Sequence, residues 1–338
     1  MMRQIKQSPL LQRLQERKRA VLLALSLLAA VLLLTAPLYV TNSYVLHVMV
    51  LIFLNIVLAS SLNLIIGYCG QVSFAHASYY GIGAYTATLL MLKLGISFWL
   101  ALLCAAIGAS ILGLIIGLPA LRLKGDYLGI VTLGFGEIVR LVLLNSQSLT
   151  RGPAGLGGIP TPVIFGVTIS GRVGFYYMVM IFAVICVIMI RRLMSSGIGL
   201  AMMAVSCDET ATESVGVNPV KYKLMAFVLG AALAGMAGCF YASYISYISP
   251  DTFVYNDSVT MLAMVTLGGL GSITGPIWGA VVITILPEVL RIISDYRMIL
   301  YGLAMVMMMI FRPEGFWGAS KREFNVYRRL AGREDKNG

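Results

Sequence analysis

Long uninterrupted runs of apolar residues dominate the chain. No Asp, Glu, Lys or Arg occurs between Arg19 and Lys93, and this stretch alone is long enough for several membrane spans of about 20 residues each. Because a backbone in lipid must satisfy its own hydrogen bonds, continuous apolar runs of this length predict helices. The predicted fold is all-α: a polytopic bundle of transmembrane helices.

The pattern predicts about ten spans of this length. Their ends are marked by basic residues, prolines and glycine-rich turns. The expected spans cover residues 20–40, 44–66, 67–92, 97–121, 127–145, 175–190, 224–246, 258–271, 276–292 and 298–311. The less regular stretches 67–92 and 258–292 leave this count open by two.

Charge supports the same architecture and gives it an orientation. The chain is 59% hydrophobic and only 12% charged, against about 25% charged residues in soluble domains. Its net charge of +11 does not indicate nucleic acid, because 19 of the 25 basic residues lie in segments expected in the cytoplasm. By the positive-inside rule both termini are cytoplasmic. The predicted domains are a basic, lipid-headgroup-binding arm (1–19), a membrane domain (20–312) and a basic tail (313–338).

A polar segment, residues 195–223, interrupts the apolar pattern between two expected spans. Within it, Ser206-x-x-Glu209 predicts a capping box at a helix start. Asp208 and Glu209 place negative charge in the first turn, where the helix dipole favours it.

The same segment also carries signals for a helix end. Gly216 fits the left-handed position after a last turn, and Pro219 prevents continuation. We therefore expect a short helix over about 207–215 on the cytoplasmic side. The alternative is a solvated loop without a partner.

Residues 67–92 are less apolar than their neighbours and rich in small and hydroxylated side chains. Gly67 and Gly70 bracket an expected break in the backbone, which is tolerated at membrane depth only beside protein or water. One interpretation is a translocation pathway; its candidate liners are Gln71, Ser73 and His76. The other is a tightly packed interior helix, with His76 satisfied by a neighbour.

A second glycine-rich stretch, GGLGSITG, divides residues 258–292. Its Gly268-x-x-Gly271 echoes Gly67-x-x-Gly70, and each pair follows an apolar run. The repetition favours two related halves, a common plan in transporters, and adds both glycines to the candidate pathway.

Glu137 and Arg140 lie inside the expected span 127–145. An ionisable pair within a span is costly and rarely faces lipid, and at this spacing the two can pair on one helix face. They either shape a polar path or subunit interface, or neutralise each other structurally. The Gly/Pro-rich loop 146–174 is expected on the outside, with turns rather than long helices.

The sequence lacks the common motifs of catalytic, nucleotide-binding and metal-binding sites. It contains no phosphate-binding loop, nucleophile elbow, zinc-protease motif or dinucleotide fingerprint, and its five cysteines have no metal-binding spacing. We expect no catalytic residue, no metal and no cofactor in this chain, and therefore not an enzyme. Because Glu137 is the only central carboxylate, a conduit driven by a separate ATPase explains the polar segment better than an ion-coupled carrier.

Several stretches, in this order, resemble the permease subunit of branched-chain amino acid ABC importers, the LivM type. They are LNLIIGYCGQVSFAHASYYGIGAYTA (62–87), LRLKGDYLGIVTLGFGEIVRLVL (121–143), GPAGLGGIP (152–160), DETATESVGVNPVKYKLMAFVLGA (208–231) and MLAMVTLGGLGSITGPIWGA (261–280).

The resemblance implies a bacterial plasma (inner) membrane protein. Its expected partners are a homologous permease forming a heterodimer, two cytoplasmic ATPases that bind the ATP, and an extracytoplasmic binding protein. It also implies that residues about 199–218 form the helix that couples to an ATPase, with Asp208, Glu209, Ala211 and Gly216 as coupling residues. Several arginines of the family pattern are replaced by Leu200, Met203 and Ser206. Alternatives are a urea or short-amide permease of the same superfamily, or a stand-alone secondary carrier.

Overall fold

The structure is a computed structural model. It describes residues 33–37, 39, 42–120, 123, 125–164, 167–169, 171–289, 302, 303 and 306, in two units, Met1–His47 and Val48–Gly338. The account below concerns the second unit. The expected arm, the tail, the basic loop residues Arg122 and Lys124, and most of the spans 20–40 and 298–311 lie outside the described residues.

Helices account for most of the described chain. They are α2 (Ser43–Asn63), a π-helical turn η1 (Leu64–Tyr68), α3 (His76–Leu94), α4 (Phe98–Ala120), α5 (Asp126–Asn145), α6 (Gln147–Thr150), α7 (Arg172–Met194), α8 (Gly197–Cys207), α9 (Glu209–Ser214), α10 (Pro219–Ile245), α11 (Tyr255–Gly268) and α12 (Thr274–Val289). Five helical segments among the described residues are long and apolar enough to cross a membrane: Ser43–Tyr68, Phe98–Pro119, Asp126–Asn145, Arg172–Met194 and Pro219–Ile245. The prediction of an α-helical membrane bundle is confirmed, and the number of spans stays a prediction.

The Gly/Pro-rich loop forms short elements, as expected. It contains α6, a 3-10 turn η2 (Gly152–Ala154) and the strands β1 (Leu156–Gly157), β2 (Val163–Ile164) and β3 (Val167–Thr168). β2 pairs with β3, and β1 pairs antiparallel with β4 (Tyr247–Ile248), which follows α10. Another 3-10 turn, η3 (Pro250–Thr252), comes next.

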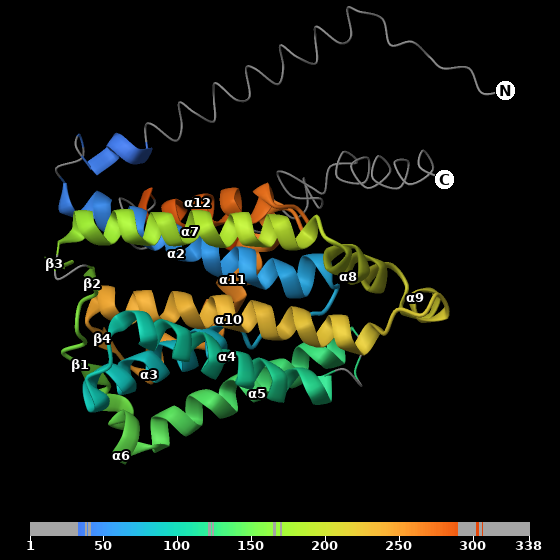
Figure 1. The fold of residues 1–338 in the computed structure, drawn as a ribbon, viewed down its shortest axis with the longest axis horizontal. Coiled ribbons are helices and arrows are strands. Elements are labelled where there is room, and N and C mark those ends of the chain that lie inside the picture. Colours follow the sequence, from blue (N-terminus) through green and yellow to red (C-terminus); the bar gives the residue numbers. More distant parts are fainter. Residues whose placement is uncertain are drawn as a thin grey trace, which may run out of the picture. The chain divides into compact units, whose positions relative to one another are not determined.

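The polar segment and the Gly/Pro-rich loop lie at opposite ends of α7 and α10. In Figure 1, α8 and α9 lie at the right, and β1, β4 and α6 lie at the left. This arrangement agrees with placing the two segments on opposite sides of the membrane.

Helix α11 is short for a membrane-crossing element. Its 14 residues cover about 21 Å at 1.5 Å per residue, against about 30 Å of hydrocarbon. The residues just before α11 are not helical, yet they pack within the bundle. The Phe253 ring, for example, lies 5.1 Å from the Tyr80 ring of α3, centroid to centroid. The expected span 258–271 is therefore a short helix preceded by irregular chain.

Small residues bring α10 into backbone contact with α3 and α4. A methyl group on Gly83 of α3 would lie only 2.2 Å from Gly235 Cα of α10, and one on Gly235 would lie 2.4 Å from Ala109 Cβ of α4. A methyl group on Gly238 would lie 2.2 Å from the Tyr80 carbonyl oxygen. Such close approach is a main source of helix association where both solvent and side chains are apolar.

This seam generates a stability prediction. We expect Gly83→Ala to destabilise the protein by about 1–3 kcal/mol, because the added methyl group meets backbone that cannot rotate away. The midpoint of thermal unfolding in detergent measures the effect. Gly134→Ala is the matched control, since nothing lies within 4 Å of a methyl group there. Equal unfolding midpoints for the two variants would contradict the close packing of α3 against α10 at Gly83.

Candidate functional site: a capped polar helix and two backbone breaks

The short helix α9 begins at a carboxylate cap. Asp208 has extended backbone (φ −158°), and its Oδ1 accepts a hydrogen bond from the Ala211 backbone N–H at 3.0 Å. The Thr212 hydroxyl donates to the Asp208 carbonyl oxygen at 2.6 Å, which holds the first turn together. Asp208 thus satisfies an N–H group that a helix start otherwise leaves without a partner.

The predicted capping box at Ser206 is wrong. Helix α8 continues to Cys207, so Ser206 is still helical, and its hydroxyl donates to the Met203 carbonyl oxygen at 2.8 Å. The cap therefore falls two residues later than the capping-box pattern indicates. The expected helix over 207–215 is observed as Glu209–Ser214.

The predicted end of this helix is confirmed. Gly216 has φ +84°, the left-handed conformation that glycine adopts without a steric cost, and its N–H donates to the Glu213 carbonyl oxygen at 2.9 Å. Pro219 is the first residue of α10, where its missing N–H costs nothing. The Asn218 side chain caps that helix by accepting from the Lys221 N–H at 3.3 Å.

An ion pair holds α9 to α10. Lys223 of α10 is buried, with 3% of its side chain exposed, and its Nζ donates to Oε1 of Glu209, which is 30% exposed. A buried ammonium group without a partner is strongly unfavourable, so Glu209 is held at this position. Sequence reasoning used Lys223 only as a positive charge beside a span. The signal for its burial was its place among apolar residues of α10.

Helix α8 attaches the polar segment to the first backbone break. Met202 of α8 packs with Cys69 and with Ala226 of α10 in a buried cluster. A methyl group on Gly70 would lie 3.1 Å from Ser206 Cβ, so the break also touches the end of α8. The expected coupling segment 199–218 therefore contacts the chain that follows α2 through Met202 and Ser206.

Both predicted backbone breaks are present. After η1, residues 69–75 are non-helical and Gly70 has φ +67°. Between α11 and α12, Gly269 and Gly271 have φ +120° and +68°. Gly268 is the last residue of α11, where a methyl group would lie 1.9 Å from the Gly275 carbonyl oxygen.

The two breaks meet at one buried side chain. Asn63, which is 1% exposed, accepts from the Gly271 N–H through Oδ1 at 3.0 Å and donates from Nδ2 to the Ser272 carbonyl oxygen at 2.8 Å. A methyl group on Gly67 would lie 2.5 Å from the Gly271 nitrogen. The glycine pairs matched in the sequence are thus neighbours in space, while Asn63 was missed.

Candidate liners in the first break are buried. His76 Nε2 lies 2.8 Å from the Ser61 hydroxyl, and the His76 ring is edge-on to Tyr79 at 5.9 Å. Ser73 is fully buried, and Gln71 donates from Nε2 to the Cys69 carbonyl oxygen at 3.3 Å. These contacts fit a packed interior in this conformation, and a pathway role for the three residues stays a prediction.

Glu137 belongs to a group of three charges. Arg140 donates from Nε to Glu137 Oε1 at 2.8 Å and from Nη1 to Asp251 Oδ1 at 3.1 Å. The predicted pair is therefore present, and Asp251 joins it from η3. Sequence reasoning had no local signal for a partner so far along the chain.

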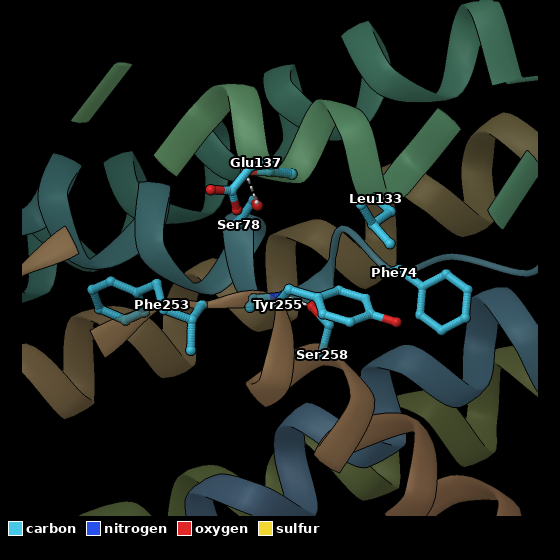
Figure 2. Close-up of a pocket in the computed structure, with 10 residues that line it drawn as sticks. Phe74, Ser78, Leu133, Glu137, Phe253, Tyr255 and Ser258 are labelled. Atoms are coloured by element: carbon cyan, nitrogen blue, oxygen red, sulfur yellow. Dashed lines mark hydrogen bonds between the residues drawn. The ribbon is translucent and has the colours of Figure 1, made fainter. Parts of the chain in front are cut away.

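Beside this group lies a small cavity. Its volume is about 10 Å³, which is the space one water molecule needs. Figure 2 shows Glu137 next to Ser78, across from Phe253, Tyr255 and Ser258. The Ser78 hydroxyl donates to the Gly136 carbonyl oxygen at 3.1 Å and ties α3 to α5. The cavity is too small for an organic solute in this conformation.

Apolar spanning helices, backbone breaks inside the bundle and a capped polar helix at one end are together the features of a transport permease. The chain belongs to the family described as branched-chain amino acid transport system / permease component, whose model matches residues 44–310. This confirms the resemblance inferred from the sequence and identifies the chain as a transport subunit rather than an enzyme.

Individual relatives agree with this family. The chain is 37% identical to the high-affinity branched-chain amino acid transport system permease protein LivM of Escherichia coli, over 86% of this chain and 74% of that protein. It is 39% identical to the LivM protein of Salmonella typhimurium, over 77% and 67%. The BraD permease protein of Pseudomonas aeruginosa is 27% identical over 79% and 92%. No solved structure matches the chain.

The ion pair between α9 and α10 generates the next prediction. Glu209→Gln should destabilise the protein by roughly 2 kcal/mol or more, because Lys223 then stays buried without a charged partner. Lys223→Met alone should cost less, since it leaves only the partly exposed carboxylate of Glu209, which water can solvate. Thermal unfolding midpoints of both single variants and the double variant form a double-mutant cycle. Additive effects would show that the two side chains are not coupled.

Proposed function

We propose that this chain is the permease subunit of an ATP-driven importer for branched-chain amino acids in the bacterial inner membrane. The observation that carries the proposal is the family match over residues 44–310, with relatives 37% and 39% identical that are named as permeases of this transport. The described fold supports it, because the helices are apolar and the breaks lie inside protein.

The proposed assembly contains a homologous permease as heterodimer partner, two cytoplasmic ATPases and an extracytoplasmic binding protein. ATP is bound by the ATPases, and this chain needs no cofactor of its own. The exposed surface of the polar segment supports docking of an ATPase: Val215 after α9 is 76% exposed and Leu200 of α8 is 51% exposed, so both are available to a partner. Membrane lipid covers the outward faces of the spans.

The proposed topology has about ten spans, cytoplasmic termini and two related halves, with the arm 1–19, the membrane domain 20–312 and the tail 313–338. In this topology α8 and α9 are cytoplasmic, and β1 and β4 face the binding protein. The opposite placement of these elements in Figure 1 supports it.

In the proposed mechanism, closure of the ATPases displaces α9. The Glu209–Lys223 ion pair transfers this displacement to α10, and the cluster of Met202 with Cys69 transfers it to the first break. Asn63 joins the first break to the second. Breaks in the backbone are the positions where spans can rearrange. The predicted liners Gln71, Ser73, His76 and Glu137 then belong to the part of the bundle that rearranges.

Reconstitution tests the proposed function. The chain in liposomes with its partner permease, ATPases and binding protein should take up leucine, isoleucine and valine when ATP is supplied, and not without ATP. The chain alone with an ion gradient is the control for a secondary carrier. Uptake by the chain alone, or transport of urea or acetamide in place of the amino acids, would overturn the proposal.

A substitution on α9 tests the coupling role. Ala211 is exposed, and only its backbone N–H is used in the cap. Ala211→Glu should lower ATP-dependent uptake at least tenfold by placing a charge in the docking surface, while membrane insertion stays normal. Ser195→Glu adds the same charge at an exposed position outside α9. If Ala211→Glu transports at the parental rate, α9 is not the docking element.

Native cysteines allow a test of sidedness. Cys207 is exposed, whereas Cys69, Cys186 and Cys239 are buried. A membrane-impermeant maleimide should label Cys207 in inside-out vesicles but not in right-side-out vesicles, and bound ATPase should slow the reaction. Cys207→Ser is the control that identifies the labelled thiol. Labelling from the outer side would reverse the proposed orientation.

A further inference from the structure

A second and larger cavity lies between α2, α3, α10 and α11. Its volume is about 180 Å³, many times the roughly 10–15 Å³ that one water molecule requires on this measure. The cavity is below the usual range of about 300–1,000 Å³ for drug-sized ligands. It therefore has room for one small organic molecule rather than for a cofactor.

Several residues that line this cavity are polar, and one is a carboxylate. Asp257 in the first turn of α11 is joined there by Asn55 of α2, Thr260 of α11 and the tyrosines Tyr80 and Tyr241. Among the described residues, no Lys, Arg or His side chain lies within ion-pair distance of Asp257. By contrast, the carboxylates of Glu137 and Asp251 share Arg140.

The rest of the cavity lining is largely apolar. Leu51, Leu54 and Leu58 line it from α2, and Met261 and Met264 line it from α11. Leucine offers a fixed surface, whereas methionine adapts to ligands of different branching. The cavity thus offers a carboxylate and hydroxyl groups to the polar part of a ligand and aliphatic side chains to its apolar part.

Asp257 also takes part in the cap of α11, and the hydrogen bond of that cap does not itself require a charge. Its Oδ2 accepts a hydrogen bond from the Val254 backbone N–H at 3.2 Å, and the amide oxygen of an asparagine would serve equally as acceptor. A carboxylate inside a membrane protein is costly, and such residues mark functional sites by default. The dipole of α11 favours a negative charge in its first turn, and a cationic ligand in the cavity would stabilise that charge further.

We propose that this cavity is a transient binding site on the translocation pathway, and that Asp257 pairs with the ammonium group of the transported α-amino acid. The tyrosine hydroxyls face the carboxylate of the ligand, and the leucine and methionine side chains contact its branched aliphatic chain. This inference rests on the proposed function and adds the residues that recognise the substrate within the membrane.

Two readouts test the site separately from the proposed function. In the reconstituted importer, Asp257→Asn should lower leucine uptake at least tenfold while leaving complex assembly and basal ATP hydrolysis unchanged, because the helix cap survives and only the charge is lost. Asp257→Glu should restore most of the uptake. Asp126→Asn makes the same chemical change in the first turn of α5, at an exposed position, and should transport normally.

The second readout needs no transport. Thr260→Cys, in a Cys207→Ser background, places a thiol in the cavity that a small maleimide labels. Millimolar leucine should slow this labelling at least threefold, whereas 4-methyl-2-oxopentanoate, which lacks the ammonium group, should not. Adding Asp257→Asn should abolish the protection by leucine.

The outcomes separate the two proposals. If the parental complex imports leucine but Asp257→Asn imports it equally well, or if leucine gives no protection at Thr260→Cys, this site is wrong and the proposed function stands. If the parental complex imports no amino acid, the proposed function fails, and the protection assay still decides whether the cavity binds one.

Discussion

A backbone that leaves helical geometry inside a membrane bundle must find hydrogen-bond partners within the protein. In this chain the side-chain amide of Asn63 provides two of them across the junction between the first and second breaks. It is the only described side chain that bonds to the backbone of the second break from outside α11, α12 and their connection. The close approach of Gly67 to Gly271 leaves no room for a larger residue beside it. The irregular centre of the bundle depends on this one amide and the small residues around it.

The same junction connects the functional elements. On one side, the first break contacts α8 and reaches α9 through Cys69, Met202 and the Lys223–Glu209 pair. On the other side, α11 leads from the second break back to the cavity at Asp257. A displacement at the polar segment and a change in the cavity are thus linked by packed groups. The elements between them are α8, α10 and α11 together with the two non-helical breaks.

Features encoded within a few residues were predictable from the sequence. The long spans, the left-handed Gly216 and the breaks at Gly67–Gly70 and Gly268–Gly271 follow from local composition and backbone preference. The start of α9 was misplaced because Ser206 and Asp208 both suit a cap, and only the length of α8 decides between them. Asn63, Asp251 and Asp257 were not recognised, because their roles depend on partners that are distant in sequence or on a cavity shared by four helices.

The seam between α3, α4 and α10 limits how this sequence can diverge. Where Gly83 faces Gly235 with no side chain between them, a larger residue on either helix cannot be offset by trimming the other, which is already at its minimum. A larger side chain is therefore unfavourable at Gly83 and at Gly235 alike. We expect homologous chains that keep this helix crossing to keep both glycines. At lipid-facing positions, by contrast, one apolar side chain can replace another with little effect on the fold.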